Sequence, residues 1–469
     1  MINTRNEKDF LGILQIKDDA YYGIHSMRAH NNFKITNYHI SNELIKSFSF
    51  VKEACAKTNK DIGLLEKDKA DAIITACHEM RNGKFDKDVI VDPLQGGAGT
   101  STNMNINEII ANRALEILGY KKGEYHIISP LDHVNLNQST NDVYPTSVKL
   151  SILFMLNELE KNIEILQSSL QKKENEFSGI IKLGRTQLMD AVPITLGMEF
   201  SAYAEALARD RWRIFKSRER IKVINLGGTA VGTGIGAPRD YILKVCLTLK
   251  KLTGLNISRS ENLIDATQNL DSIVEVSGML RCLASNLFKI SNDLRLLGSG
   301  PNGGLSEIVL PALQAGSTVM PGKINPVIPE AIAQSSLRVM SNDSFITFSC
   351  SSGNLEINQY YPLIAFSIIE SLQILINSTK IFSDLCISGI QANNEKCRKH
   401  LNNSQAIATL FMHKVGYGKM SELSIEAKNK NKSLIEHLID TGILTDEDIS
   451  KALSSQNINS LGYRSSNKK

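Results

Sequence analysis

The chain has 469 residues, of which 42% are hydrophobic and 22% are charged, and its formal net charge at pH 7 is +4. This composition is that of a large globular protein with a sizeable core. The weakly basic balance lacks the concentrated positive charge of nucleic-acid-binding proteins, so no nucleic acid is expected as a partner.

The N-terminal stretch shows no targeting signal. It reads MINTRNEKDFLGILQIKDD, carries charges throughout, and lacks the apolar core of a signal peptide. No later stretch of about 18 residues is both apolar and uncharged, so no membrane span is expected. The seven cysteines show no C-x-x-C spacing, which predicts buried thiols in a reducing compartment. These features together favour a cytoplasmic protein.

Long amphipathic helices are predicted in the middle of the chain. Apolar residues recur every three or four positions over residues 147–177, which gives one apolar helix face. Similar stretches cover about 193–223, 271–297, 327–349 and 361–385. Long helices with a sustained apolar face are typical of a bundle or a subunit interface. The predicted fold class is therefore mainly α with a central long-helix bundle.

Three domains are expected along the chain. An N-terminal domain covers residues 1–141, the central helical bundle covers 142–388, and a small C-terminal domain covers 389–469. The C-terminal stretch SLIEHLIDTGILTDEDISKAL predicts two short helices. Gly442 ends the first helix, and Thr445 begins a capping box with Asp448 in the second.

Four polar clusters interrupt these elements, at residues 96–105, 133–146, 184–197 and 314–330. Each is rich in hydroxyls, amides and glycine, and none gathers His, Cys or carboxylates at metal-ligand spacing. Hydroxyls, amides and backbone N–H groups donate hydrogen bonds to carboxylate oxygens, and a lysine adds a countercharge. The shared chemistry indicates a pocket for a small dicarboxylate, although any single cluster of this kind is more often a turn or a helix cap.

The fourth cluster contains GSTVMPGKIN, which resembles the G-S-x-x-M-x-x-K-x-N signature of the aspartase/fumarase superfamily. Six further segments resemble that superfamily in its order, over nearly the whole chain: DAYYGIHSMRA, QGGAGTSTNMNINEIIANRA, HVNLNQSTNDVYPT, GRTQLMDAVPITLGMEF, NLGGTAVGTGIGAP and NDLRLLGSGPNGGLSEIVLPALQAGS. The resemblance implies a three-domain, mainly α fold and a homotetramer built around a helix bundle, with each site taking residues from three subunits. It implies no organic cofactor, and activation by a divalent cation such as Mg²⁺ is a feature of some relatives.

Details within these motifs favour the ammonia-lyase branch of the superfamily. QSTND places Thr140 where fumarases usually carry a second serine, and GRTQ places Gln187 where fumarases and some aspartases carry histidine and other bacterial aspartases carry glutamine. The implied reaction is the reversible elimination of ammonia from L-aspartate to give fumarate through an aci-carboxylate intermediate. Class II fumarate hydratase is the alternative enzyme. A lyase for another β-substituted amino acid and a non-catalytic structural protein on the same scaffold are further alternatives.

The resemblance also assigns roles to residues of the site. Ser317 matches the general base, which needs N–H donors, positive charge and exclusion of water to lower its pKa. Glycine and proline around it are expected to let this loop close over the substrate. The positions that match carboxylate-binding residues are Thr100, Ser139, Thr140 and Thr318 for the β-carboxylate, and Thr186, Lys323 and Asn325 for the α-carboxylate. Asn141 and Gln187 match positions around the amino group, where Gln187 is expected to orient the ammonium without titrating.

Overall fold

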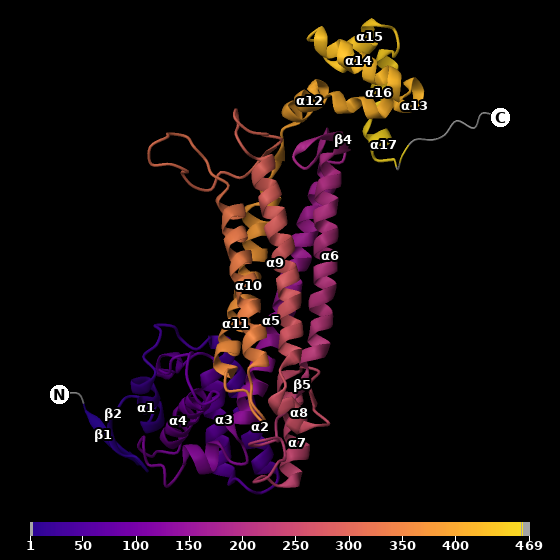
Figure 1. Cartoon of the computed structure of the whole chain (residues 1–469). Coiled ribbons are helices and arrows are strands. Elements are labelled where there is room, and N and C mark those ends of the chain that lie inside the picture. The colour runs from indigo at the N-terminus through magenta and orange to yellow at the C-terminus, as the bar shows by residue number, and fades with distance from the viewer. Residues whose placement is uncertain (1–2, 461, 463–469) are drawn as a thin grey trace. The chain divides into compact units, whose positions relative to one another are not determined.

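Long helices dominate the structure, which is a computed structural model that describes residues 3–460 and 462. In this described part, five helices have 25 residues or more, and they are labelled in Figure 1: α5 (Thr140–Glu176), α6 (Leu196–Ile221), α9 (Asp271–Leu297), α10 (Val327–Ser351) and α11 (Tyr361–Leu385). Four of them agree with the predicted ranges to within a few residues. The mainly α prediction is confirmed.

Helix α5 begins earlier than the sequence pattern predicts, at Thr140 and not at residue 147. Pro145 lies inside this helix and has no N–H to donate to the Asn141 carbonyl four residues before it. The Asn225 side chain donates to that carbonyl instead, at 2.9 Å. The Ser139 hydroxyl accepts from the Asn141 N–H at 3.2 Å and so caps the helix. A helix can therefore run through the proline.

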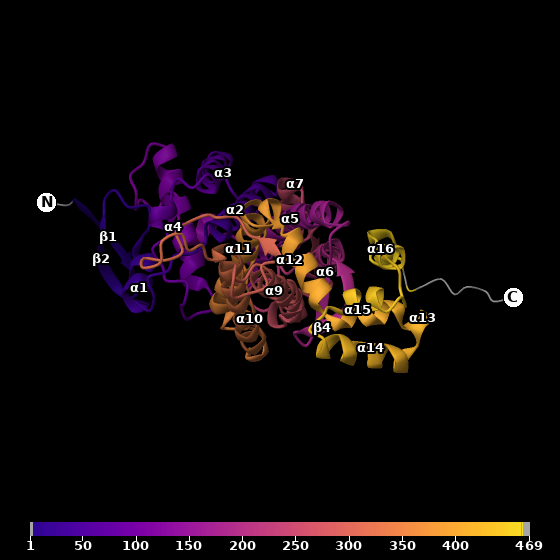
Figure 2. The same ribbon diagram turned by 90° about the horizontal axis from the view of Figure 1, so that it is seen from above.

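Side-chain contacts connect the long helices to one another, and both Figure 1 and Figure 2 show these helices side by side. Each contact described here lies within one of the two units into which the chain divides. The pairs are Arg218–Glu160 between α6 and α5 at 2.8 Å, Tyr203–Asp293 between α6 and α9 at 3.0 Å, Ser277–Asp343 between α9 and α10 at 2.7 Å, and Asn342–Glu370 between α10 and α11 at 2.7 Å.

The first unit comprises Met1–Glu160, Arg213–Cys282 and Arg338–Ile376. Besides its parts of the long helices it contains the antiparallel pair β1 (Thr4–Asp9) and β2 (Gly12–Lys17) and the parallel pair β5 (Val223–Ile224) and β6 (Ser258–Arg259). Its helices are α1 (Ile24–Asn32), α2 (Asn42–Asp61), α3 (Lys67–Arg81), α4 (Thr100–Ile117), α7 (Arg239–Thr253) and α8 (Leu263–Gln268), with the short 3₁₀-helix η1 (Asp86–Asp88) and the short π-helix η2 (Pro130–Val134).

The second unit comprises Lys161–Trp212, Leu283–Leu337 and Asn377–Lys469. It contains the hairpin of β3 (Ile181–Thr186) and β4 (Met189–Thr195) and the antiparallel pair of β7 (Ile308–Val309) and β8 (Gln391–Ala392). Its remaining elements are η3 (Ile387–Gly389), α12 (Asn394–Asn403), η4 (Gln405–Phe411), α13 (Met412–Val415), α14 (Tyr417–Asn429), α15 (Leu434–Asp440), α16 (Asp446–Ala452) and α17 (Ser455–Ile458).

The C-terminal helices share a buried apolar cluster, which includes Ile407, Phe411, Leu423 and Leu438 and also Leu183 of β3. The predicted helix signals are confirmed there. Gly442 has a φ of +68° just after α15, and the Thr445–Asp448 capping box precedes α16. The division into three domains at residues 141 and 388 stays a prediction.

Two findings bear on the expected buried thiols and on the membrane. Five of the seven cysteines are buried as predicted, but the prediction is wrong for Cys282 and Cys350, which are half-buried on the long helices α9 and α10. Among the described residues, Tyr361–Gly389 is long and apolar enough to cross a membrane, with a mean hydropathy of 1.3. Because 67% of its scored window is buried inside the structure, this segment also has the character of a core helix.

Candidate active site

The ten predicted site residues fall into two sets, one in each unit. The first unit holds Thr100, Ser139, Thr140 and Asn141, and the second holds Thr186, Gln187, Ser317, Thr318, Lys323 and Asn325.

In the first unit, two polar clusters that are distant in sequence meet at Thr140. Its side chain is only 8% exposed, and its hydroxyl oxygen accepts a hydrogen bond from Asn103 Nδ2 at 3.1 Å. Asn103 lies on α4, in the same cluster as Thr100. The contact therefore joins the start of α4 to the start of α5 and places predicted β-carboxylate-binding residues at the ends of neighbouring helices.

Asp142 organises the same region from inside. Its buried carboxylate accepts from the Ser139 N–H at 3.0 Å and from the Gly227 and Thr229 N–H groups at 3.1 Å each. Asn141 also reaches this glycine-rich loop, since its Nδ2 donates to the Ala230 carbonyl at 2.7 Å. Burial raises the pKa of Asp142 to about 7, although the backbone N–H groups oppose that rise.

Thr100 stands exposed at the first position of α4, and its hydroxyl donates to the Gly97 carbonyl at 2.8 Å. The preceding residue, Gly99, has a φ of +96°. A Cβ added there would lie 2.3 Å from the ring of Tyr144, a distance that real Cβ contacts do not reach. The close approach of α4 to α5 thus requires glycine at position 99.

A fully buried lysine supports these two helices. Lys52 Nζ donates to Asn135 Oδ1 at 3.1 Å and to Gln138 Oε1 at 2.9 Å. Burial lowers the pKa of Lys52 to about 8, and the negative charge of Asp142 opposes this shift. Because Asn135 Oδ1 also accepts from Asn103 Nδ2 at 3.2 Å, the lysine is connected through two amides to Thr140.

In the second unit, Thr186 and Gln187 lie at the exposed tip of the β3–β4 hairpin. Thr186 pairs with Met189, so Gln187 and Leu188 form the two-residue turn. Their φ angles are +54° and +63°, the left-handed values of a type I′ turn that usually contains Asn and Gly. The hairpin therefore holds Gln187 in a conformation that a glutamine seldom adopts on its own.

The segment that carries Ser317 is irregular, as the breaker residues predict, because no helix or strand covers residues 310–326. Ser317 is half-buried, and its Oγ accepts hydrogen bonds from the Val319 N–H at 3.1 Å and the Met320 N–H at 2.9 Å. N–H donors of this kind favour the ionised form of a hydroxyl. The same two bonds also describe a common serine turn, which needs no catalytic role.

The ends of this loop are joined by hydrogen bonds around Gly316. The Gly316 N–H donates to the Lys323 carbonyl at 2.8 Å, and Asn325 Nδ2 donates to the Gly316 carbonyl at 2.7 Å. The Lys323 and Thr318 side chains are exposed, whereas Asn325 is half-buried. Ser317 thus lies next to the hydrogen bonds that close the loop, and the Lys323 side chain faces solvent.

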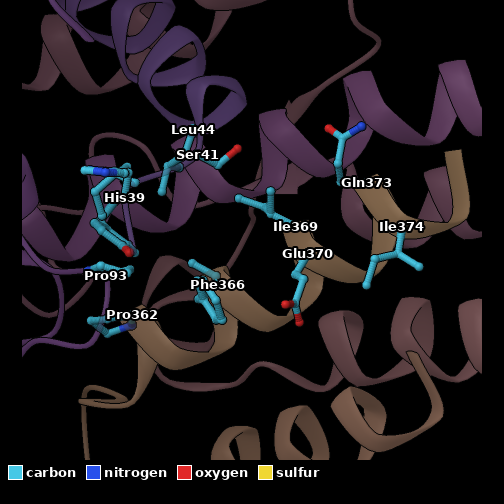
Figure 3. Close-up of a pocket in the computed structure, with 13 residues that line it drawn as sticks. His39, Ser41, Leu44, Pro93, Pro362, Phe366, Ile369, Glu370, Gln373 and Ile374 are labelled. Atoms are coloured by element: carbon cyan, nitrogen blue, oxygen red, sulfur yellow. The ribbon is translucent and has the colours of Figure 1, made fainter. Parts of the chain in front are cut away.

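The predicted residues line neither of two cavities in the described structure. Figure 3 shows an apolar cavity of about 230 Å³ in the first unit, lined among others by Leu44, Phe366 and Ile369. The other, of about 410 Å³, lies in the second unit between α9 and α10 and includes Arg295 and Glu330.

Within residues 3–460 and 462, no group of three or more His, Cys, Asp or Glu side chains could hold a metal ion. Mg²⁺ usually keeps several waters and takes only one or two carboxylates from a protein.

Sequence reasoning missed the residues that hold the site residues in place. Asn103, Asp142 and Arg185 all stand inside motifs that carry the family resemblance, within three residues of a predicted site residue. Their contacts run to Thr140, to the loop at Gly227 and to Glu307. A buried polar or charged side chain inside a recognised motif would have been the signal, but burial is not visible in a single sequence.

Comparisons with known proteins identify the family. The lyase family model matches residues 12–341. The chain is 47% identical to an aspartate ammonia-lyase of Bacillus sp over 451 residues, 96% of each chain. Its structure resembles crystal structures of the fumarate lyase:delta crystallin from Brucella melitensis bound to cobalt (TM-score 0.93, 41% identity, 97% of this chain and 99% of that one) and of a class II fumarase from Schistosoma mansoni (TM-score 0.90, 33% identity, 97% and 98%). With its mainly α architecture and its ordered motifs, the chain belongs to the lyase family within the aspartase/fumarase superfamily.

Proposed function

We propose that this chain is an aspartate ammonia-lyase, a carbon–nitrogen lyase that converts L-aspartate reversibly into fumarate and ammonia. The observation that carries the proposal is the near-full-length similarity to the Bacillus sp aspartate ammonia-lyase. Identity to the class II fumarase is lower, at 33%. Thr140 and Gln187, which differ from the usual fumarase residues, favour the ammonia-lyase over fumarate hydratase.

In the proposed mechanism Ser317 is the general base. It removes a proton from the carbon next to the β-carboxylate, and the electron pair moves into that carboxylate to give a dianionic aci-carboxylate. The carbon–nitrogen bond then breaks, ammonia leaves, and the double bond of fumarate forms. The N–H groups of Val319 and Met320 support this role, because they point at Ser317 Oγ and stabilise its ionised form.

The other residues bind and orient the substrate. Hydroxyls of Thr100, Ser139, Thr140 and Thr318 would hold the β-carboxylate, where negative charge develops. Removal of one such donor typically costs about 2.7–4 kcal/mol of transition-state stabilisation. Thr186, Lys323 and Asn325 would hold the α-carboxylate, and Asn141 and Gln187 would orient the amino group.

The active form is proposed to be a homotetramer in which three subunits contribute to each site. Two observations support this. The ten residues line neither of the two cavities described above, and α10 exposes large apolar side chains, with Phe345 47% and Phe348 72% exposed. Light scattering during size-exclusion chromatography tests it, since a monomer of 51.8 kDa would contradict the assembly.

No organic cofactor is part of the proposal, and a cytoplasmic location is proposed with it. Activation by Mg²⁺ or another divalent cation is also proposed, because such activation is a feature of some relatives. Assays with and without a chelator test that activation directly.

The function is tested by following the ultraviolet absorbance of fumarate when the purified protein receives L-aspartate or L-malate in parallel. Fumarate from aspartate alone supports the proposal. Fumarate from malate alone would make the chain a fumarate hydratase, and neither product would favour a different substrate or a structural role. The Ser317→Ala variant then distinguishes the proposed site from a contaminating activity.

A further inference from the structure

Glu307 is a fully buried carboxylate that contacts three basic side chains. Arg185 donates to it through both arms of its guanidinium, Nη1 to Oε2 at 2.9 Å and Nη2 to Oε1 at 2.7 Å. Lys182 Nζ lies 3.0 Å from Oε2, and His400 Nδ1 lies 2.8 Å from Oε1. Burial opposes ionisation of Glu307, but the Arg185, Lys182 and His400 side chains hold its pKa below the usual value.

The four residues of this cluster come from three segments of the second unit. Lys182 and Arg185 lie on β3, His400 lies on α12, and Glu307 precedes β7 on the stretch that leads to the Ser317 loop. The backbone of Glu307 is also fixed, because its carbonyl accepts from the Asn393 N–H at 2.9 Å. Glu307 is thus held by backbone and side-chain contacts, and Lys182 and Arg185 link β3 to it.

The attachment is made next to a turn that needs support. Arg185 is followed directly by Thr186 and by the left-handed residues Gln187 and Leu188. A left-handed backbone is strained for a non-glycine residue, so it persists only where the surroundings fix it. On the other side of Arg185 the strand register shifts at Gly184, where an added Cβ would lie 2.5 Å from the Val192 carbonyl oxygen.

We propose that Arg185 and Glu307 are positioning residues for the reaction: their two-bond pairing holds the β3–β4 turn so that Thr186 and Gln187 present their polar groups to the α-carboxylate and amino group of the substrate. This inference rests on the proposed function for the identity of the substrate. Neither residue of the pair contacts the substrate in this proposal. The pair acts by fixing the geometry of the turn.

A role in stability alone would predict a fall in the amount of active enzyme with KM unchanged. Buried ion pairs are often close to neutral for stability, because desolvation of the charges offsets their attraction. A planar, two-bond contact fixes direction as well as distance, and a lysine ammonium cannot reproduce it. Variants that keep every charge but lose the two-bond geometry therefore separate positioning from stability.

The test uses two such variants of the full-length protein. Arg185→Lys keeps the positive charge but cannot form the planar two-bond contact. Glu307→Asp keeps the carboxylate and withdraws it by one methylene. Arg211→Lys is the matched control, since Arg211 makes a surface ion pair with Glu164 at 3.1 Å in the same unit. If one cluster variant fails to fold, the other still decides the question.

Three readouts are compared: KM and kcat for L-aspartate, the thermal midpoint, and amide hydrogen exchange at residues 186–189. We expect KM to rise about tenfold with kcat within about threefold, because Thr186 contacts a carboxylate that is bound equally in the ground and transition states. Exchange in the turn should become faster, the thermal midpoint should shift little, and the control should match the wild type in all three.

Unchanged KM and kcat in a folded variant would overturn the proposal. So would a fall in the amount of active enzyme with KM unchanged, which is the signature of a purely structural role. If the wild type forms no fumarate from aspartate, the proposed function fails independently. Hydrogen exchange then still tests the pairing, and unchanged exchange at 186–189 in both variants would overturn it.

Discussion

The two sets of proposed site residues differ in how the fold holds them. In the first unit, Thr140 is buried, contacts Asn103, and stands beside the fully buried Asp142. In the second unit, Ser317 lies in an irregular loop whose internal hydrogen bonds are short-range, with Lys323 exposed. One set is built into helix termini, and the other is carried on a loop and a hairpin turn.

This difference implies a division of labour. Helix termini with buried partners can hold a carboxylate at a fixed place, whereas a loop closed only on itself can move without unfolding its surroundings. Changes in the first set should therefore affect stability together with activity. Changes in the Ser317 loop should affect activity with little effect on stability.

The largest effect is expected for Ser317→Ala. Loss of a general base should lower kcat by about 10³-fold, while the free energy of unfolding changes by less than about 0.5 kcal/mol, because Ser317 lies in a loop outside the core. The fumarate assay and urea unfolding at fixed protein concentration measure the two quantities. Ser168→Ala, an exposed serine on α5, is the control. A large loss of stability would contradict the proposed difference between the two sets, because the loop would then be part of the core.

Gly99→Ala tests the set of site residues in the first unit. The left-handed backbone costs alanine about 1–2 kcal/mol, and overpacking against Tyr144 adds about 1–3 kcal/mol. We expect stability to fall by about 3 kcal/mol in urea unfolding. Gly63→Ala is matched in backbone, with a φ of +77°, but nothing lies within 4 Å of its added Cβ. Equal losses in the two variants would mean that the contact of α4 with α5 does not constrain the site.

The sequence predicted the long helices well because each carries a repeated apolar face, as in α9 and α11. It missed the start of α5, because the effect of Pro145 is offset by Asn225, which is 80 residues away in the chain. The motifs gave the candidate residues, since hydroxyls and amides around Thr140 and Ser317 have a recognisable order. Their supports, Asp142 and Glu307, act through tertiary contacts that no local pattern encodes.

Asp142→Asn tests the set of site residues in the first unit through the pH dependence of stability. The pKa of Asp142 is raised from 3.8 to about 7 by burial, so between these values the folded protein holds a proton that the unfolded chain has lost. Its contribution to stability is therefore present at low pH and is lost as the pH rises towards 7. The variant should remove a slope of up to about 1.4 kcal/mol per pH unit.

Urea unfolding at several pH values between 4 and 7 measures this slope. Glu108, whose pKa burial also raises to about 7, keeps its own contribution, so the slope should decrease and not vanish. Asp448→Asn is the control, because hydrogen bonds from Lys414 and Thr445 lower the pKa of Asp448 to about 2 and its contribution changes only below the window. An unchanged slope in Asp142→Asn would show that this carboxylate is ionised throughout.

The smallest effect is expected for Thr318→Ser. Both residues supply a hydroxyl, and the Thr318 side chain is exposed, so neither packing nor hydrogen bonding should change much. We expect kcat/KM for L-aspartate within about twofold of the wild type, as for other exposed substitutions. Thr318→Val has the same shape without the hydroxyl and should lower kcat/KM by about 10²-fold. Because the two variants differ in that one group, equal activity in both would remove Thr318 from the β-carboxylate site, and the loop would then contribute its base but no carboxylate donor.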